Sequence, residues 1–290
     1  MKAEFEEKQY EQHLNLELLQ GENLILPPGQ VLENTFGFDA ALFSKHPKFW
    51  KHYPHMYKWY HKYFRQAPNG IKLPIELWKD LEYEVQDLPP FKFNIFIQHK
   101  RPEYMSKENS AEWSSWNSPY YRYSIMEHQQ QTLMTLENKV NNNGIVTYAC
   151  PTFHTKQEFW NAVKNKSFIQ NSNFCQPKFL HNHLKYTFQN GGTYGIAHSK
   201  PEKIDGINIQ EQIQMFRKKT SNQNNDNREY LLTLSETVDN TINEIQNLQE
   251  QYYMMQEEMI PKNINSNIAK SLIKIDIFSF LTDIKVNIAV

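Results

Sequence analysis

The chain begins with a charged segment whose apolar positions recur at helical spacing. Residues 1–20 (MKAEFEEKQYEQHLNLELLQ) predict an amphipathic helix, and LPPGQ at residues 26–30 starts a new element. Three later apolar runs, each bounded by turn residues, predict strands. They are GFDAALFS (37–44), FKFNIFIQHK (91–100) and NGIVTYACP (143–151).

Two further segments have apolar residues at helical spacing. Residues 124–142 predict a helix that the following NNNG ends, and residues 155–165 predict a helix with Phe159, Trp160 and Val163 on one face. Strands and helices therefore alternate, which predicts a mixed α/β core.

The C-terminal part of the chain has a different pattern. Residues 217–229 (RKKTSNQNNDNRE) predict a polar linker. Apolar residues then recur at heptad spacing over 231–259, which predicts a coiled coil for self-association or partner binding, or a long helix packed on its own domain. Residues 271–290 alternate with period two and predict two short strands.

Composition narrows the class of protein. The 290 residues carry 31 basic and 32 acidic side chains, so attraction to a polyanion requires local clustering of charge. No apolar run has the length of a membrane helix, and the mean hydropathy is −0.73. Two cysteines and the lack of a cleavable apolar leader favour a cytoplasmic protein without a disulfide framework.

The strand at 91–100 ends in polar residues that suggest chemistry. Gln98 and Lys100 share one face of a strand, because side chains alternate with period two. Asp39 opens the preceding strand, and Glu33 stands on a short helix before it. Mg²⁺ takes oxygen ligands, so Asp39, Gln98, Glu33 and the backbone carbonyl of His99 are candidate metal ligands.

Lys100 beside such an ion could activate a water and offset charge on phosphorus, which predicts phosphodiester hydrolysis. The alternative is that QHK is only a polar strand end and Asp39 caps a turn.

GFD at Asp39 and QHK at Gln98 and Lys100 resemble the PD-(D/E)XK, or restriction-endonuclease-like, nucleases of the Q-x-K branch. The resemblance implies an αβββαβ core over about residues 25–165, a catalytic glutamate such as Glu33 on the first helix, and a glutamine on the helix after the Q-x-K strand. One of Gln129, Gln130 and Gln131 suits that role, with Gln130 as the candidate. The chain is also similar to uncharacterised bacterial proteins found near defence genes.

A basic and aromatic segment lies in the expected insertion at about residues 41–90. Residues 41–75 contain no acidic side chain, and their cations alternate with aromatics that could stack on bases, while the cations contact phosphates. An aromatic helix pair packed on the core is the other interpretation. The candidate DNA contacts are Lys45, Lys48, Lys51, Lys58, Lys62, Arg65 and Arg101.

Together these observations predict a nuclease domain at residues 1–200 and a helical C-terminal region at 201–290. The predicted activity is Mg²⁺- or Mn²⁺-dependent cleavage of DNA, as the effector of a bacterial defence system. The alternative is a catalytically degenerate nucleic-acid-binding or assembly subunit of a larger complex. In either case residues 231–259 are expected to join a homo-oligomer or a partner protein.

Overall fold

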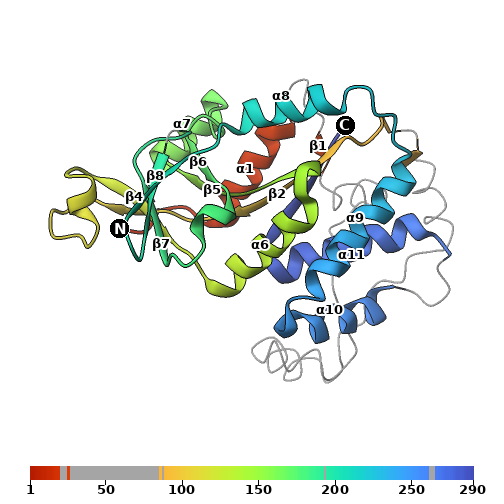
Figure 1. Cartoon of the computed structure of the whole chain (residues 1–290). Helices are drawn as coiled ribbons and strands as arrows, with labels where there is room; N and C mark the ends of the chain where they lie inside the picture. Colours follow the sequence, from red (N-terminus) through yellow and green to blue (C-terminus); the bar gives the residue numbers. More distant parts are fainter. Residues whose placement is uncertain (20–24, 27–84, 87, 193, 261–264) are drawn as a thin grey trace, which may run out of the picture. The chain divides into compact units, whose positions relative to one another are not determined.

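The computed structural model describes residues 1–19, 25–26, 85–86, 88–192, 194–260 and 265–290. They form a mixed α/β protein with two five-stranded sheets (Figure 1). The chain divides into two compact units. Unit 1 contains residues 1–25, 92–223 and 283–290, and unit 2 contains residues 26–91 and 224–282. Unit 1 thus combines residues from both predicted domains.

The first sheet of unit 1 has the strand order β1-β10-β2-β5-β6. Its strands are β1 (Ile25–Leu26), β10 (Ile284–Ala289), β2 (Phe93–His99), β5 (Gly144–Pro151) and β6 (Ser172–Cys175). The predicted strands at 91–100 and 143–151 are confirmed. β2 is parallel to β5 and antiparallel to β10, so both of its edges are paired. Every residue of β2 is buried, as a central strand requires.

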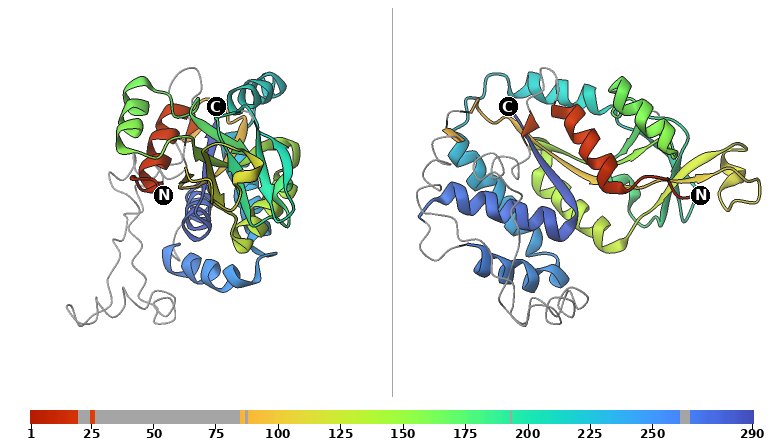
Figure 2. Two further views of the ribbon diagram at one scale, coloured as in Figure 1. Left: turned by 90° about the vertical axis from the view of Figure 1, so that its left-hand side faces the viewer. Right: turned by 180° about the vertical axis from the view of Figure 1, so that it is seen from behind.

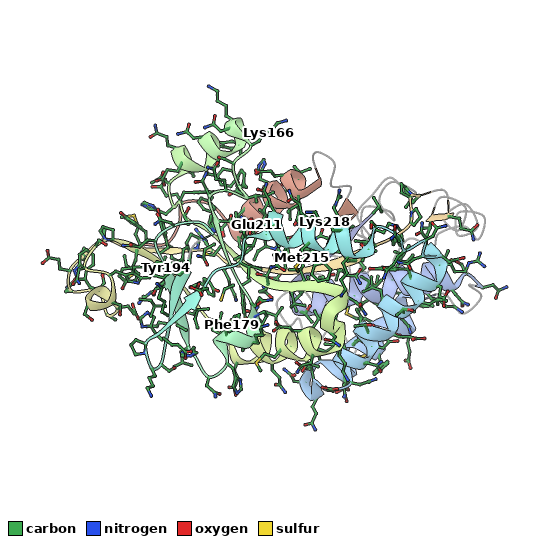
Figure 3. The ribbon with its side chains drawn as sticks, turned by 45° about the horizontal axis from the view of Figure 1, so that its top comes forward. Lys166, Phe179, Tyr194, Glu211, Met215 and Lys218 are labelled. Carbon is green, nitrogen blue, oxygen red and sulfur yellow. The ribbon has the colours of Figure 1, made fainter. Side chains whose placement is uncertain are left out.

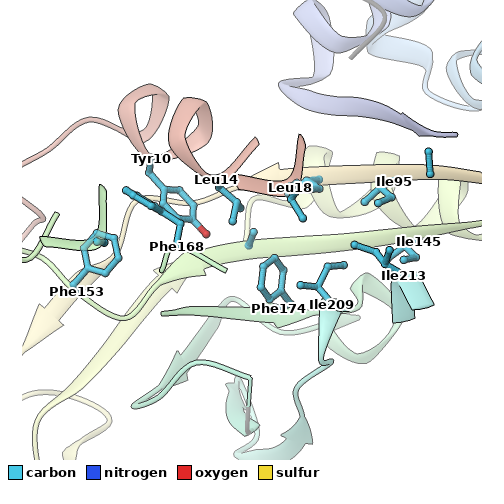
Figure 4. Packing of buried hydrophobic residues seen from close by; sticks show 14 of the residues in the cluster. Tyr10, Leu14, Leu18, Ile95, Ile145, Phe153, Phe168, Phe174, Ile209 and Ile213 are labelled. Atoms are coloured by element: carbon cyan, nitrogen blue, oxygen red, sulfur yellow. The ribbon is translucent and has the colours of Figure 1, made fainter. Parts of the chain in front are cut away.

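Helices cover both faces of this sheet. They are α1 (Glu7–Leu19), α6 (Glu127–Val140), α7 (Lys156–Asn165) and α8 (Ile209–Thr220). The side chains of Phe93, Ile95 and Ile97 on β2 enter a core cluster with residues of α1 and α8 (Figure 4). α6 lies on the opposite face from α1 (Figures 1 and 2).

Two expectations about these helices were wrong. α8 continues to Thr220, because Phe216 and Thr220 are buried, so the predicted linker at 217–229 begins too early. Its exposed side carries Glu211, Met215 and Lys218 (Figure 3). On α7, Phe159 is buried and Trp160 is 58% exposed, so these adjacent residues do not share the packed face.

The second sheet of unit 1 is an antiparallel meander with the order β3-β4-β7-β8-β9. Its strands are β3 (Glu103–Met105), β4 (Tyr120–Ser124), β7 (Lys185–Phe188), β8 (Tyr194–His198) and β9 (Glu202–Asp205). Short 3₁₀ helices are η1 (Trp113–Ser115), η2 (Asn141–Asn143) and η3 (Pro177–Leu180). The buried Glu112 carboxylate accepts hydrogen bonds from Tyr120, Arg122 and Lys185, so its charge is compensated.

The described part of unit 2 contains α9 (Asn227–Ile242), α10 (Gln246–Met259) and α11 (Asn267–Thr282). The expectation of a single long helix over 231–259 is wrong, because the helix is interrupted between Ile242, the end of α9, and Gln246, the start of α10. α9 and α10 both pack against α11, so the apolar heptad positions are largely used inside the unit. Asp239 accepts hydrogen bonds from Tyr252 (2.8 Å) and Lys274 (2.6 Å).

The first of the two strands expected in 271–290 is wrong, because these residues belong to the helix α11. Its buried residues include Ile273, Ile275 and Ile277, so apolar side chains occupy several sides of the helix. A helix buried on several sides produces an alternating pattern that resembles a strand. The second expected strand in 271–290 is confirmed as β10. None of the described helices is both long and apolar enough to cross a membrane.

Because β10 lies inside the first sheet, we expect a chain ending at Thr282 to lose the fold of unit 1. Ile284, Val286 and Ile288 are at most 3% exposed, and their burial contributes about 5–9 kcal/mol. That is comparable with the whole stability of a typical domain, about 5–15 kcal/mol. Circular dichroism and limited proteolysis would measure the loss, with a chain ending at Ala289 as control. Protection of unit 1 in the shorter chain would contradict the expectation.

Candidate active site

The candidate site lies where β2 ends. Gln98 and Lys100 point to the same side, as their spacing predicts, and are only 0% and 7% exposed. The side-chain Oε1 of Gln98 is buried and has no hydrogen-bond partner among the described residues. His99 points to the other side and contacts the Tyr10 ring edge-on at 5.7 Å. A buried amide oxygen without a partner is costly, so this oxygen is a candidate ligand atom.

Asp283 reaches this site from the C-terminal end of the chain. It directly precedes β10, whose first residue, Ile284, pairs with Gln98. Asp283 has a φ of 58°, in the left-handed region that Asp and Asn tolerate best after glycine. The side chain is 39% exposed, so its carboxylate stays accessible at the end of the strand.

Glu7 brings a second carboxylate from the first turn of α1. Its Oε2 accepts a hydrogen bond from the Arg101 backbone N–H at 3.0 Å, which ties α1 to the residue after Lys100. Burial and the neighbouring Asp283 carboxylate together raise the pKa of Glu7 to about 7, against the opposing effects of Lys100 and the Arg101 N–H. Two carboxylates therefore share one confined region.

Lys8 supplies a positive charge beside this pair. Its Nζ forms ion pairs with Asp283 (2.5 Å) and Glu11 (2.9 Å), and Glu11 also pairs with Lys285 at 3.1 Å. Burial lowers the pKa of Lys8, but the hydrogen bonds to Asp283 and Glu11 outweigh it and raise that pKa. The Lys8 ammonium thus compensates the Asp283 charge from a largely exposed position.

The Lys100 ammonium is held by residues of α6 and β5. Its Nζ donates to Gln129 Oε1 at 2.5 Å and lies 5.5 Å from the centre of the Tyr148 ring. Burial lowers the pKa of Lys100, and the Glu7 charge works in the opposite direction. A lysine with a lowered pKa can exchange a proton with a reacting group more easily.

The structure separates the roles of the three glutamines on α6. Gln129 contacts Lys100, Gln130 contacts Tyr148 and the Pro177 carbonyl, and Gln131 is exposed. Gln130, the candidate from sequence, therefore reaches Lys100 only through its neighbours. Sequence reasoning could place a glutamine at this site but could not select Gln129, because helix rotation relative to the sheet is set by packing.

His99 is a predicted ligand through its backbone carbonyl only. That carbonyl oxygen lies 3.4 Å from Gln98 Nε2. The imidazole is fully buried, and burial together with the charges of Lys285 and Lys8 lowers its pKa to about 3. The ring is therefore neutral at physiological pH.

The other predicted residues are only partly accounted for. Arg101 donates to Glu6 at 2.8 Å and to the Ala3 carbonyl at 2.6 Å, so its guanidinium is bound to the N-terminal segment. The rest lie outside the described residues: Glu33, Asp39, Lys45, Lys48, Lys51, Lys58, Lys62 and Arg65.

Sequence reasoning missed Glu7 and Asp283. Each had a recognisable signal: Glu7 is in the first turn of the predicted N-terminal helix, and Asp283 directly precedes a run with strand periodicity. What the sequence did not reveal is that the last strand pairs with β2.

The donor atoms at this site are mainly oxygens. Nowhere in the described part of the chain do three His, Cys, Asp or Glu side chains gather as a metal-binding group. At the end of β2 the Glu7 carboxylate acts on Asp283 and on Lys100, and the Gln98 amide and the His99 backbone carbonyl belong to the same strand end. Hard cations such as Mg²⁺ use ligands of this kind and retain waters at the remaining positions.

Comparisons with known proteins do not identify a family for this chain. Neither protein-family models, curated proteins nor solved structures gave a match to this chain. The resemblance to PD-(D/E)XK nucleases therefore remains a prediction from the motif.

We expect Glu7→Gln to stabilise the metal-free protein above neutral pH. The Glu7 carboxyl ionises near pH 4.5 when unfolded and near pH 7 when folded, so wild-type stability falls as the pH rises through that window. The variant lacks this loss, which is on the order of 1–3 kcal/mol. Urea denaturation in EDTA at pH 5 and pH 8 measures the difference. The exposed Glu6→Gln is the matched control, and equal pH dependence of Glu7→Gln and wild type would contradict the assignment.

Proposed function

We propose that this protein is a metal-dependent nuclease that hydrolyses DNA phosphodiester bonds at the β2-end site. The observation that carries the proposal is the proximity of the Asp283 and Glu7 carboxylates to Lys100, at the end of the strand that also carries Gln98. The Q-x-K resemblance implies carboxylates, a glutamine and a lysine at one strand end. Asp283 and Glu7 would supply carboxylates of the kind that the sequence suggests for Asp39 and Glu33, which lie outside the described residues.

The residues fit a divalent cation, Mg²⁺ or Mn²⁺. Asp283, Glu7 and the partnerless Gln98 Oε1 would hold it, together with the His99 carbonyl. Burial and, after it, repulsion from the Asp283 carboxylate raise the pKa of Glu7, and a bound cation would relieve that repulsion. A bound ion would polarise the phosphate and lower the pKa of a coordinated water.

The remaining chemistry belongs to Lys100. Its ammonium lies in a buried position beside Glu7, where it can hold a phosphate oxygen or the attacking water and offset developing negative charge. Gln129 fixes the orientation of that ammonium through its side-chain oxygen. Lys100 is thus the proposed catalytic residue, and Gln129 orients it by accepting its hydrogen bond.

DNA is the proposed substrate because the chain concentrates cations and aromatics in one segment. Residues 45–65 combine lysines with stacking side chains and contain no acid, which suits a nucleic-acid backbone.

The second candidate function is a degenerate nucleic-acid-binding subunit. Two observations favour it: Gln98 replaces an acidic ligand, and Lys8 already neutralises Asp283. Both functions predict salt-sensitive DNA binding, but only the nuclease needs Asp283 and Lys100 for cleavage.

We expect purified protein with Mg²⁺ or Mn²⁺ to cut plasmid DNA, and Asp283→Asn and Lys100→Met each to reduce cutting at least about 100-fold. Asparagine is compatible with the left-handed backbone of Asp283, so the variant removes the charge without straining the turn. Gel assays of supercoiled and linear DNA measure the loss, with circular dichroism as the test of folding.

The controls separate the proposal from its rivals. Asp205→Asn, on the exposed part of β9, should cut as wild type does. Asp39→Asn in the same assay tests whether Asp39, the candidate from the sequence, is also needed for cutting. DNA binding by a folded wild type without cutting under any metal condition would favour the degenerate subunit.

Lys8→Met should lower the Mg²⁺ concentration needed for half-maximal thermal stabilisation, because a metal ion no longer competes with the ammonium for Asp283. A partly exposed ion pair contributes up to about 1 kcal/mol, so the expected change is up to about fivefold. Thermal-shift titration with MgCl₂ measures it. Lys164→Met on the exposed side of α7 is the control, and an unchanged midpoint in Lys8→Met would show that the two cations do not compete.

A further inference from the structure

Tyr148 lies at the centre of a connected set of polar contacts beneath Lys100. It stands on β5 directly opposite Gln98 in the parallel ladder, and its side chain is 1% exposed. The Lys100 Nζ lies 5.5 Å from its ring centre, within the range of a cation–π contact. The ring therefore forms the surface against which the ammonium rests.

The Tyr148 hydroxyl continues the connection toward α6. It donates to Gln130 Oε1 at 2.8 Å, and Gln130 Nε2 donates to the Pro177 carbonyl at 2.7 Å. Both ends of the Gln130 amide are therefore used, one on β5 and one on η3. Figure 3 labels Phe179 on the same short helix, η3. The first turn of α6 is thereby fixed relative to the sheet.

The position of α6 in turn sets the position of Gln129. Gln129 precedes Gln130 on the helix and accepts the hydrogen bond from Lys100 Nζ. A rotation or shift of the α6 N-terminus would move Gln129 away from the ammonium. The Tyr148–Gln130–Pro177 connection opposes such a shift.

We propose that Tyr148 and Gln130 are positioning residues, which hold the Lys100 ammonium through the Tyr148 ring and through the placement of Gln129. The proposal rests on the proposed nuclease function as far as catalysis is concerned. Its geometric part, the fixed orientation of Lys100, stands on the contacts alone. Reacting groups must be held closely, and a displacement of about 1 Å can cost on the order of 100-fold in rate.

The neighbouring Tyr123 provides a matched comparison. Its ring lies 5.6 Å from that of Tyr148, and it is 3% exposed. Its hydroxyl has no hydrogen-bond partner within the described part of the chain. Tyr123→Phe and Tyr148→Phe therefore remove the same atom from similar surroundings, and only the second breaks the link to Gln130.

The test compares Tyr148→Phe, Gln130→Leu, their combination and Tyr123→Phe in the full-length protein. We expect a reduction in kcat for DNA cleavage of about tenfold in each single variant, with KM within about twofold, because the link orients Lys100 rather than binding DNA. The double variant should be no slower than the slower single variant, since both remove one connection. Tyr123→Phe should match wild type.

A second readout is independent of cleavage. In ¹³C-lysine NMR, the Lys100 side-chain signal, identified by its loss in Lys100→Met, should be shifted by the Tyr148 ring current. Tyr148→Leu should abolish that shift, and Gln130→Leu should move or broaden the signal. If wild type fails to cut DNA but these NMR changes occur, the nuclease function fails and the positioning stands. If the Lys100 signal in Tyr148→Phe and in Gln130→Leu is the same as in wild type, and only the melting temperature falls, the positioning proposal is overturned.

Discussion

The candidate site depends on the pairing of β10 with β2. This antiparallel pairing joins the last residues of the chain to a strand near residue 95, and its register places Ile284 opposite Gln98. Asp283 is consequently held at the end of β2, beside the charged groups of Glu7 and Lys100. Because side chains alternate on a strand, a shift of one residue would turn the β10 side chains to the opposite faces. The buried residues of β10 oppose that shift.

The same pairing creates an electrostatic problem that the surrounding residues compensate. Glu7 and Asp283 carry like charges in a partly buried region, and the structure balances them with Lys8 on one side and Lys100 on the other. A neutral amide at Gln98 avoids a third negative charge. The amide therefore adds no repulsion to the two carboxylates, and its oxygen remains a possible ligand.

Local elements of unit 1 could be predicted because their patterns are local. β2 and β5 appeared as apolar runs between turn residues, and α6 and α7 as helical spacing, the latter with a capping box from Thr155 to Glu158. α11 could not be read correctly, since burial on several sides removed the contrast between a polar and an apolar face. The continuous 231–259 helix failed for another reason: heptad spacing does not show where a helix ends.

The strand end that carries Gln98 and Lys100 could be predicted from the sequence, but the proximity of Glu7 and Asp283 to it could not. Gln98 and Lys100 come from one strand, so their common face follows from period two alone. Asp283 is far from them in sequence, and only tertiary pairing joins the two regions. Asp39, the candidate aspartate from the sequence, lies outside the described residues. The sequence predicts a strand near the C-terminus but does not show that this strand pairs with β2.

Different residues of the C-terminal segment contribute to stability and to the proposed function. The strand residues Ile284, Val286 and Ile288 are buried and hold the sheet together, whereas Asp283 precedes the ladder and keeps part of its side chain exposed. Its left-handed backbone is satisfied equally well by asparagine, which retains the turn. The fold therefore demands a residue that tolerates this conformation, whereas the Asp283 carboxylate forms the ion pair with Lys8 and, in the proposed function, would also hold a cation.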